Sequence, residues 1–133
     1  MKGPIYLFDT HALIFWKEKE SVSGDFIQFF DEQAKKGCLY VSSISFWEVA
    51  LLVKKKRIII KDVVAWKNEI LNNGNIQLID PTSIEMINSV LLPDLHKDPF
   101  DRLLISQAFS HNCLLVTKDK DIKKYDLPVF WVS

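Results

Sequence analysis

Four acidic residues occupy positions where a carboxylate needs an explanation. Asp9 directly follows the apolar run 5–8, and Glu48 lies among hydrophobic residues in "SSISFWEVALLVKKKRI". Asp101 opens the apolar segment "DRLLISQA", and Asp119 comes shortly after the apolar run 114–116. An ionised carboxylate in such surroundings is unfavourable unless it reaches water, a base or a metal ion. The pattern therefore suggests chemistry at these positions.

Each acid also has an ordinary structural interpretation. Asp9 could cap a helix over "THALIFW", and Glu48 could pair with a lysine on the surface of its own helix. Asp98 and Asp101 could cap or complement the dipole of the helix that they precede. Asp119 could be a simple turn residue. Considered one at a time, these acids can therefore be assigned either a structural or a chemical role.

The elements that must position these acids follow from the apolar pattern. Short apolar runs bounded by polar or turn residues predict strands at residues 5–8, 38–41, 76–79, 114–116 and 129–132. Helical spacing predicts helices over residues 25–35, 62–71, 83–91 and 102–109. Thr82 and Glu85 have the spacing of a capping box at the start of the third of these helices. Alternating strands and helices predict a mostly parallel sheet with helices on both faces.

Such a topology can bring the four acids together. In parallel sheets of this kind, sites form beyond the carboxyl ends of the strands. Clustered carboxylates repel one another and raise each other's pKa unless a cation neutralises them. Mg²⁺ and Mn²⁺ prefer oxygen ligands, so either ion suits a site without histidine or cysteine, and such sites typically serve phosphoryl chemistry. His11, His96 and His111 lack metal-ligand spacing and are assigned no chemistry.

Length and composition limit the classes of protein. The chain has 133 residues, 48% of them hydrophobic, which predicts one domain over residues 1–133 with a proper core. Seventeen acidic residues balance seventeen basic ones, so any site for a polyanion must be local. No apolar run is long enough to span a bilayer, and the start of the chain does not read as a secretory signal, so we expect a cytoplasmic protein without membrane contact. Cys38 and Cys113 suit small structural thiols.

The motifs resemble those of the PIN-domain ribonucleases, and among them the toxins of VapBC-type toxin-antitoxin pairs. "YLFDTHALIFW" resembles the opening strand of the family with its first acid, and "SSISFWEVALLVKKKRI" resembles the second motif. "HKDPFDRLLISQAFSHNCLLVTKDKDIKKY" resembles the third and fourth motifs together, and its spacing is the most specific part. The departure from the family is slight, since Ser106 and Gln107 replace small alanines often seen there. The resemblance implies a three-layer α/β/α sandwich around a mostly parallel five-stranded sheet.

The resemblance also implies an activity and roles for residues. It implies metal-dependent endonucleolytic cleavage of RNA, with Mg²⁺ or Mn²⁺ held by Asp9, Glu48, Asp101 and Asp119 as catalytic and metal-binding residues. The accessory positions would be Thr10, Asp98 and Asp121.

Basic residues near the acids are candidates for phosphate contacts. The densest basic run is "KKKR", which a solvated helix end also explains. The candidates for contact with RNA are Lys54, Lys55, Lys56, Arg57, Arg102 and Lys118.

Part of the apolar content could serve assembly instead of the core. The residues concerned are Phe15, Trp16, Phe46, Trp47 and the run 51–53. Core packing is the default for them. The alternative is a homodimer contact or a groove for an antitoxin protein, which similar proteins use to block the site.

Other functions remain open from the sequence. A phosphotransfer enzyme could use Asp9 as nucleophile, although such enzymes normally have a second aspartate where His11 stands. A Toprim-like metal enzyme could use the Asp119-Lys120-Asp121 sequence, but this would leave the other acids unexplained. A PIN-like scaffold could bind RNA or a partner without cleavage, and the intact set of four acids argues against it.

Overall fold

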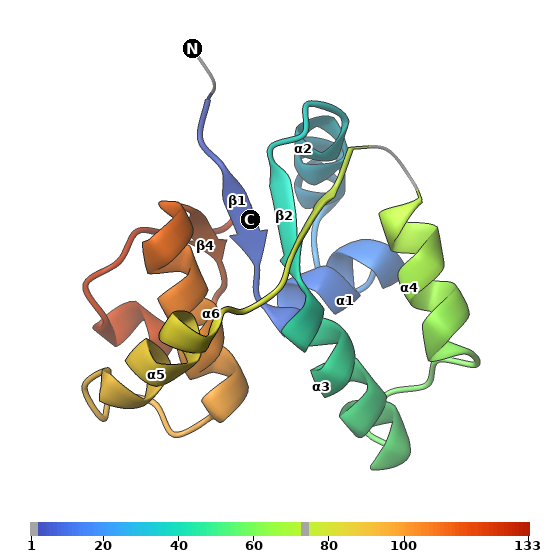
Figure 1. Ribbon diagram of the computed structural model, residues 1–133. Coiled ribbons are helices and arrows are strands. Elements are labelled where there is room, and N and C mark those ends of the chain that lie inside the picture. Colours follow the sequence, from blue (N-terminus) through green and yellow to red (C-terminus); the bar gives the residue numbers. More distant parts are fainter. Residues whose placement is uncertain (1–2, 73–74) are drawn as a thin grey trace.

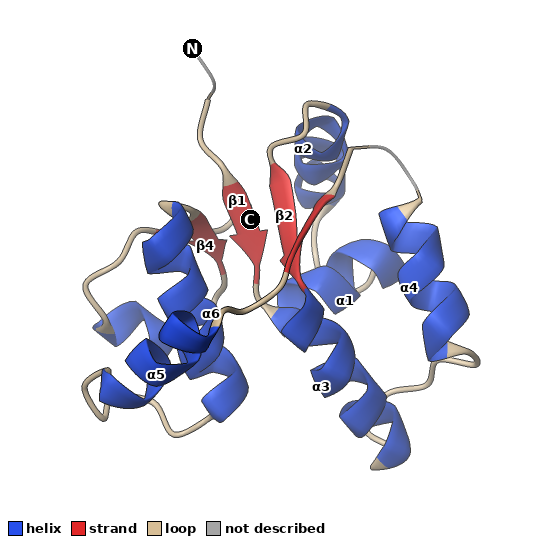
Figure 2. Cartoon of the chain, viewed as in Figure 1, coloured by secondary structure: helices blue, strands red, loops and turns tan. Residues whose placement is uncertain are grey.

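Five parallel strands form the centre of the molecule in a computed structural model that describes residues 3–72 and 75–133. The strand order is β3-β2-β1-β4-β5, so the first strand of the chain lies in the middle of the sheet. Figure 2 shows the strands enclosed by helices. The strands are β1 (Tyr6–Phe8), β2 (Leu39–Ser42), β3 (Gln77–Ile79), β4 (Leu114–Val116) and β5 (Val129–Phe130). All four strand pairs are parallel, which confirms the predicted class of sheet.

Six α-helices and one short 3-10 helix connect these strands in the described residues (Figure 1). Their bounds are α1 (Thr10–Glu18), α2 (Gly24–Lys35), α3 (Ser43–Lys54), α4 (Val63–Leu71), α5 (Ser83–Leu91), α6 (Pro99–His111) and η1 (Ile122–Lys124). The predicted helices agree with these bounds to within three residues. The largest difference is at α6, which begins at Pro99 because proline suits the first helical turn and Asp98 caps it.

The strands alternate their side chains between two hydrophobic clusters. Tyr6 and Phe8 point to a cluster with α1, α2 and α4, whereas Leu7 points to a cluster with α6. Because successive side chains of a strand face opposite sides of a sheet, the three residues of β1 contribute to both cores. The chain therefore forms the predicted three layers, with helices on both faces of the sheet.

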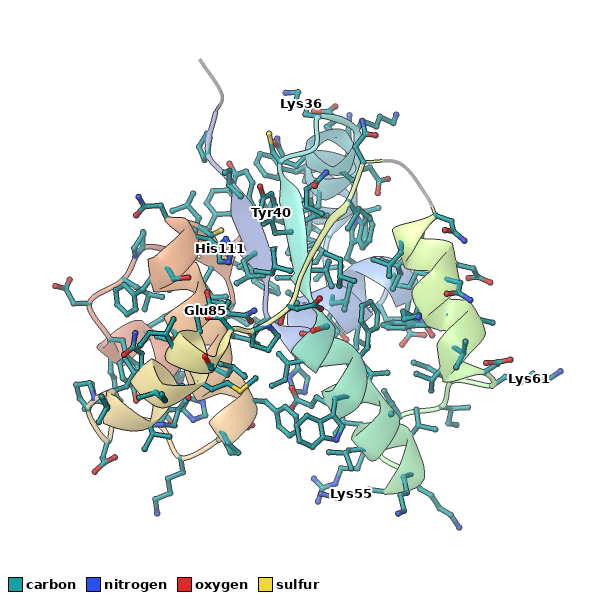
Figure 3. All side chains as sticks on the ribbon, in the orientation of Figure 1. Lys36, Tyr40, Lys55, Lys61, Glu85 and His111 are labelled. Carbon is teal, nitrogen blue, oxygen red and sulfur yellow. The ribbon has the colours of Figure 1, made fainter. Side chains whose placement is uncertain are left out.

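Helix α5 is fixed to α6 by a buried glutamate. Glu85 closes the predicted capping box with Thr82, and its carboxylate also accepts a hydrogen bond from Ser110. The Nε2 atom of His111 lies 3.4 Å from the same carboxylate, and Figure 3 shows Glu85 and His111 on neighbouring helices. Burial raises the pKa of Glu85, but these hydrogen bonds outweigh burial and hold that pKa below its ordinary value.

Most of the apolar residues that were open to either core packing or assembly belong to the core, which was the default interpretation. Trp16 is buried, while Phe46, Leu52 and Val53 pack against the core. Trp47 is the exception, with 62% of its surface exposed. The larger exposed group lies on α5 and comprises Ile84, Met86, Ile87, Val90 and Leu91.

The remaining predictions concern membranes and cysteines. Within residues 3–72 and 75–133, the structure contains no helix with the length and apolar character that a bilayer crossing requires. Both cysteines are free thiols, and Cys113 is buried. Burial raises the pKa of Cys113 to about 11, so it stays a neutral thiol, as predicted for a structural residue.

Candidate metal centre

An acidic cavity of about 290 Å³ lies where β1 and β4 end. Its acidic lining comes from the residue after β1, the start of α6 and the loop after β4. Two histidines, a lysine and two aromatic side chains complete most of the wall. The lining residues are Asp9, His11, Ala12, Phe15, His96, Asp98, Asp101, Lys118, Asp119 and Trp131.

Asp9 serves both as a helix cap and as a buried acid. Its Oδ1 atom accepts a hydrogen bond of 2.7 Å from the backbone N–H of Ala12, which confirms the capping interpretation. The residue is only 5% exposed. Burial raises its pKa, and the hydroxyl of Thr117 and the Ala12 N–H oppose that rise. Because a carboxylate has two oxygens, the cap leaves Oδ2 available for a second role.

Glu48 is buried on α3 and does not line the cavity directly. It is 7% exposed, and its Oε1 atom has no hydrogen-bond partner among the described residues. Burial raises its pKa, while the nearby Thr10 hydroxyl lowers it and the charge of Asp98 raises it further. The Thr10 hydroxyl itself donates to Ser45 Oγ at 3.0 Å. An unpartnered buried carboxylate oxygen of this kind is suited to a cation.

Asp101 has a strongly raised pKa in the cavity. Burial is the largest cause, and together with the charges of Asp98, Asp9, Glu48 and Asp119 it raises the pKa to about 8. With Asp101 itself, this set contains all four acids that the sequence singled out. The fold therefore brings them close enough to destabilise a negative charge at Asp101.

Asp119 is oriented by its own turn. Its Oδ1 atom accepts hydrogen bonds from the backbone N–H groups of Asp121 at 2.8 Å and Ile122 at 3.1 Å. Its Oδ2 atom faces His96 Nε2 at 3.4 Å. Asp121, in contrast, is exposed and forms an ion pair with Lys124 at 2.9 Å, so it points to a surface partner.

Sequence reasoning missed His96. Its Nε2 atom lies 3.0 Å from Asp101 Oδ2, and one ligand atom from each of His96, Asp101 and Asp119 fits within 4.8 Å of the others. His96 lies in a loop, where no periodic pattern marks it. The available signal was its place just before the cap of the helix that carries Asp101.

Lys118 is the basic residue that lines the cavity. Its Nζ atom lies 5.6 Å from the ring centroid of Phe15 and 5.2 Å from that of Trp131. These distances are typical of cation–π contacts. The two rings therefore hold an ammonium group at the edge of the acidic cavity.

The other predicted basic contacts lie elsewhere. Three exposed lysines lie at the end of α3, namely Lys54, Lys55 and Lys56, and Figure 3 labels Lys55. Arg57 lines a separate hollow beside Ile58. None of them lines the acidic cavity.

Arg102 requires a correction, because the prediction that it contacts RNA conflicts with its hydrogen bonds. Its five N–H donors bind carbonyl groups at the end of α5 and in the loop before α6, and the hydroxyl of Tyr125, which leaves no free donor for a phosphate. The acceptors are Ser89 O, Val90 O, Leu92 O, Pro93 O, His96 O and Tyr125 Oη.

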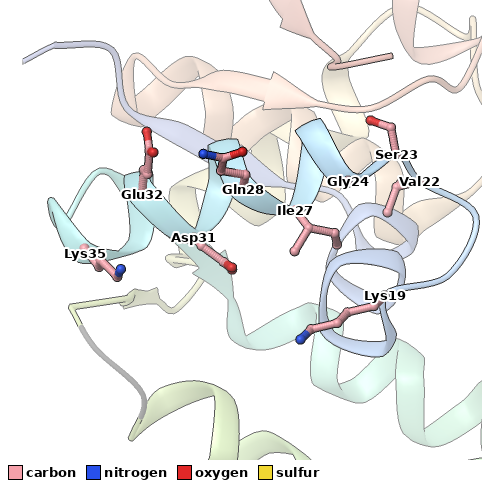
Figure 4. Close-up of a pocket in the computed structure, with 9 residues that line it drawn as sticks. All are labelled: Lys19, Val22, Ser23, Gly24, Ile27, Gln28, Asp31, Glu32 and Lys35. Atoms are coloured by element: carbon pink, nitrogen blue, oxygen red, sulfur yellow. The ribbon is translucent and has the colours of Figure 1, made fainter.

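A larger hollow of about 580 Å³ lies along α2 and the turn before it (Figure 4). Its charged side chains are of mixed sign, with Lys19 and Lys35 beside Asp31 and Glu32. Asp31 already accepts a hydrogen bond of 3.0 Å from the indole of Trp16. We assign no chemistry to this hollow.

The acidic cavity fits a hard divalent cation. Its acidic ligand atoms are carboxylate oxygens, and Oε1 of the nearby Glu48 has no hydrogen-bond partner among the described residues. Burial and uncompensated negative charge raise the pKa of Asp101. The fold and the site together define a class of α/β domain in which carboxylates gather beyond the ends of parallel strands. The chain belongs to the PIN domain family, whose model matches residues 6–127.

Known proteins share both sequence and fold with this chain. "Ribonuclease VapC22" of Mycobacterium tuberculosis is 27% identical over 128 residues, which cover 92% of each chain. The structure of VapBC2 from Rickettsia felis bound to a promoter DNA fragment matches with a TM-score of 0.75 and 20% identity, covering 97% of this chain and 99% of that one. DNA-bound VapBC from Salmonella typhimurium matches with a TM-score of 0.72 and 13% identity, covering 97% and 98%. A toxin-antitoxin complex from Klebsiella pneumoniae has a TM-score of 0.64 and 19% identity over 94% and 96%.

Family membership removes two of the alternatives. The family model covers β1, α3, α6 and β4, the elements in or beside which the four acids lie. A phosphotransfer enzyme centred on Asp9 and a Toprim-like enzyme centred on Asp119 and Asp121 are therefore excluded. The exposed ion pair of Asp121 with Lys124 agrees with this exclusion.

Proposed function

We propose that this protein is a metal-dependent endoribonuclease and the toxin of a VapBC-type toxin-antitoxin pair, with residues 1–133 forming a single PIN domain. The observation that carries the proposal is the acidic cavity, in which burial and four other carboxylates raise the pKa of Asp101 to about 8. The likeness to a ribonuclease over 92% of the chain supports the reaction class.

Asp9, Glu48, Asp101 and Asp119 are the residues that would hold Mg²⁺ or Mn²⁺. When bound, such an ion supplies Lewis-acid chemistry for phosphodiester hydrolysis, by acidifying water and offsetting phosphate charge. Asp9 would present the oxygen that its cap leaves unused, and Asp119 the oxygen opposite its turn. Thr10 and Asp98 would orient the set through their contacts at Ser45 and at the start of α6.

Lys118 would attract the RNA backbone to this cavity. Its ammonium is held by two aromatic rings and has no carboxylate within ion-pair distance among the described residues. A phosphate at the cavity would meet this charge first, because the other predicted lysines lie outside the lining.

An antitoxin protein is the proposed partner, because several solved relatives are complexes of toxin and antitoxin. A homodimer also remains a proposal, and we assign the contact to the exposed apolar face of α5 instead of the surface predicted from sequence. Apolar surface on a two-fold axis is complementary to itself, so a second copy would cover this face.

Cleavage of RNA tests the proposed function directly. Total RNA is incubated with the wild type, Asp9→Asn and Asp101→Asn, each with Mg²⁺, with Mn²⁺ and with a chelator. We expect both variants and the chelated wild type to lose at least about 100-fold in rate, because outer-sphere changes alone commonly cost 10–100-fold at metal sites. Asp126→Asn, at an exposed position outside the cavity, is the matched control. Equal cleavage by all proteins would overturn the metal-site proposal, and RNA binding without cleavage would support the scaffold alternative.

A further inference from the structure

His96 occupies a position between two of the candidate metal ligands. Its side chain is only 10% exposed, and its Nε2 atom lies 3.0 Å from Asp101 Oδ2 and 3.4 Å from Asp119 Oδ2. These two acids come from different parts of the fold, the start of α6 and the loop after β4. A single imidazole nitrogen is thus in reach of both.

The loop that carries His96 is firmly held. Arg102 Nη1 donates to the carbonyl of His96 at 3.0 Å, and other donors of Arg102 bind carbonyl groups at the end of α5 and at the start of the same loop. Tyr125 donates its hydroxyl proton to Pro93 O at 2.7 Å and accepts from the Leu95 N–H at 3.2 Å. The imidazole therefore reaches the acids from a fixed backbone.

A backbone hydrogen bond defines which nitrogen of His96 carries the proton. The N–H of Asp98 donates to His96 Nδ1 at 3.0 Å. An amide N–H can only donate, so Nδ1 must present a lone pair, and in a neutral imidazole the proton then lies on Nε2. A protonated Nε2 has no lone pair for a metal ion. His96 therefore cannot serve as a metal ligand through Nε2 in this arrangement.

The Nε2–H group lacks a well-aligned acceptor. Nε2 is fully buried and forms no hydrogen bond by angle with any described residue, although Asp101 Oδ2 is at hydrogen-bond distance. A buried donor without a partner is unfavourable, and hydrogen bonds of catalytic sites are often poorly aligned before the site is loaded. A small rotation of the ring or of the carboxylate would align Nε2–H with Asp101 or Asp119.

We propose that His96 is a neutral positioning residue, which donates Nε2–H to the Asp101 and Asp119 carboxylates and stands outside the metal-ligand set. This inference rests on the proposed function for its biological meaning, while the state of the imidazole can be measured without it. The donor holds Oδ2 of Asp101 and leaves Oδ1 of that residue for the cation. On Asp119, Oδ1 is taken by the turn, and Oδ2 has two lone pairs, one to accept from Nε2–H and one to face the cation. Unlike a lysine or arginine, it adds no positive charge that would compete with the ion.

The tautomer is tested first, on the wild type labelled with ¹⁵N in histidine. Long-range ¹H–¹⁵N correlation spectra distinguish protonated from unprotonated ring nitrogens, and His11→Gln and His111→Gln variants assign the signals. We expect an unprotonated Nδ1 and a protonated Nε2 for His96, both without metal and with saturating Mg²⁺. An Nε2 that is unprotonated in either state would overturn the proposal.

Metal affinity is tested second, by calorimetric titration with Mg²⁺ and without RNA. His96→Ala should weaken Mg²⁺ binding by about 10–100-fold, the usual effect of losing an outer-sphere partner. His96→Gln keeps an N–H donor at nearly the same distance from the backbone and should restore most of the affinity. His111→Gln is the matched control, because His111 contacts Glu85 instead of the cavity, and its affinity should equal that of the wild type.

The outcomes separate this inference from the proposed function. Unchanged Mg²⁺ affinity in His96→Ala would overturn the positioning role, even if RNA cleavage by the wild type is found. A wild type that binds no Mg²⁺ would contradict the proposed function, while a protonated Nε2 would still support His96 as a donor. If His96→Ala does not fold, the spectra of the wild type and the titration of His96→Gln decide the question.

Discussion

The raised pKa of Asp101 means that the candidate site is protonated, and therefore incomplete, in the metal-free protein near neutral pH. Burial and the neighbouring acids raise this pKa from 3.8 to about 8. The folded protein thus binds a proton that the unfolded chain releases at neutral pH. This contribution to stability is fully present below pH 3.8, and it is lost as the pH rises through about 8.

We therefore predict that Asp101→Asn stabilises the metal-free protein at pH 8. The amide carries no charge, so the free energy of unfolding should rise by about 1–3 kcal/mol, in the range of single substitutions that remove a buried unpaired charge. Thermal unfolding of the wild type and the variant at pH 5 and pH 8 measures this, and the gain should be smaller at pH 5.

The control for this prediction is Asp126→Asn, which changes an exposed aspartate and should alter stability by less than about 0.5 kcal/mol. Saturating Mg²⁺ should reduce the advantage of Asp101→Asn, because binding to the wild type adds its own stabilisation. A variant that is less stable than the wild type at pH 8 would contradict the raised pKa.

Lys118 provides a second prediction at the scale of the residue. Replacing a lysine that contacts one phosphate should weaken RNA binding and reduce the slope of log affinity against log salt concentration by about 1. We expect this for Lys118→Gln, measured with single-stranded RNA by fluorescence anisotropy on an Asp101→Asn background that prevents cleavage. Lys120→Gln is the matched control, since Lys120 is exposed two residues away and does not line the cavity. Equal salt slopes for both variants would show that Lys118 does not contact phosphate.

At the scale of the elements, the caps explain why the sequence predicts so much of the fold. Asp9, Thr82 and Asp98 accept hydrogen bonds at the starts of α1, α5 and α6, and each can be recognised from its spacing to an apolar run. The acids at strand ends were predictable for the same reason, because the apolar runs mark where the strands stop.

Long-range contacts were not predictable from local patterns. Arg102 resembles a basic residue beside an acid in the sequence, but its donors close a loop whose shape appears only in three dimensions. His96 has no periodic context, and its nearness to Asp119 depends on how the loop before α6 lies beside the loop after β4. The apolar residues around Trp16 are more numerous than one helix face needs, which suggested a contact surface as an alternative to the core. Packing against α2 and α4 buries most of them.

Glu85 allows a test of the contact between α5 and α6. Glu85→Ala removes the capping box and the hydrogen bond with Ser110, and should lower the free energy of unfolding by about 1–3 kcal/mol. Urea unfolding at pH 7 measures this. The pKa of Glu85 is lowered in the fold, so its contribution is present above the unfolded value of 4.5 and is lost as the pH falls through the folded value.

The comparison for Glu85 is Glu69→Ala, which breaks an ion pair with Lys17 in which the glutamate side chain is 64% exposed. Exposed pairs contribute at most about 1 kcal/mol, so this variant should unfold close to the wild type. Equal loss in the two variants would mean that the buried network around Glu85 adds nothing beyond an ordinary surface pair.

At the scale of the whole molecule, the exposed face of α5 predicts self-association. Light scattering over a dilution series should detect a dimer, and Leu91→Lys should shift it to monomer, because burying a lysine against an apolar surface is unfavourable. Val64→Lys on α4 introduces the same charge at a similarly exposed apolar position and should leave the dimer intact. A wild type that is monomeric at every concentration would remove the dimer from the proposal.

The central position of β1 has a consequence for the timing of synthesis. β1 is synthesised before the other strands of the sheet, but it pairs with β4, which comes much later in the chain. The candidate site also needs acids that lie as far apart in the sequence as residues 9 and 119. Until β4 has emerged from the ribosome, the chain therefore lacks Asp119, and its central strand has an unpaired edge. Under the proposed function, a chain still attached to the ribosome cannot cleave RNA before β4 and Asp119 have emerged and β4 has paired with β1.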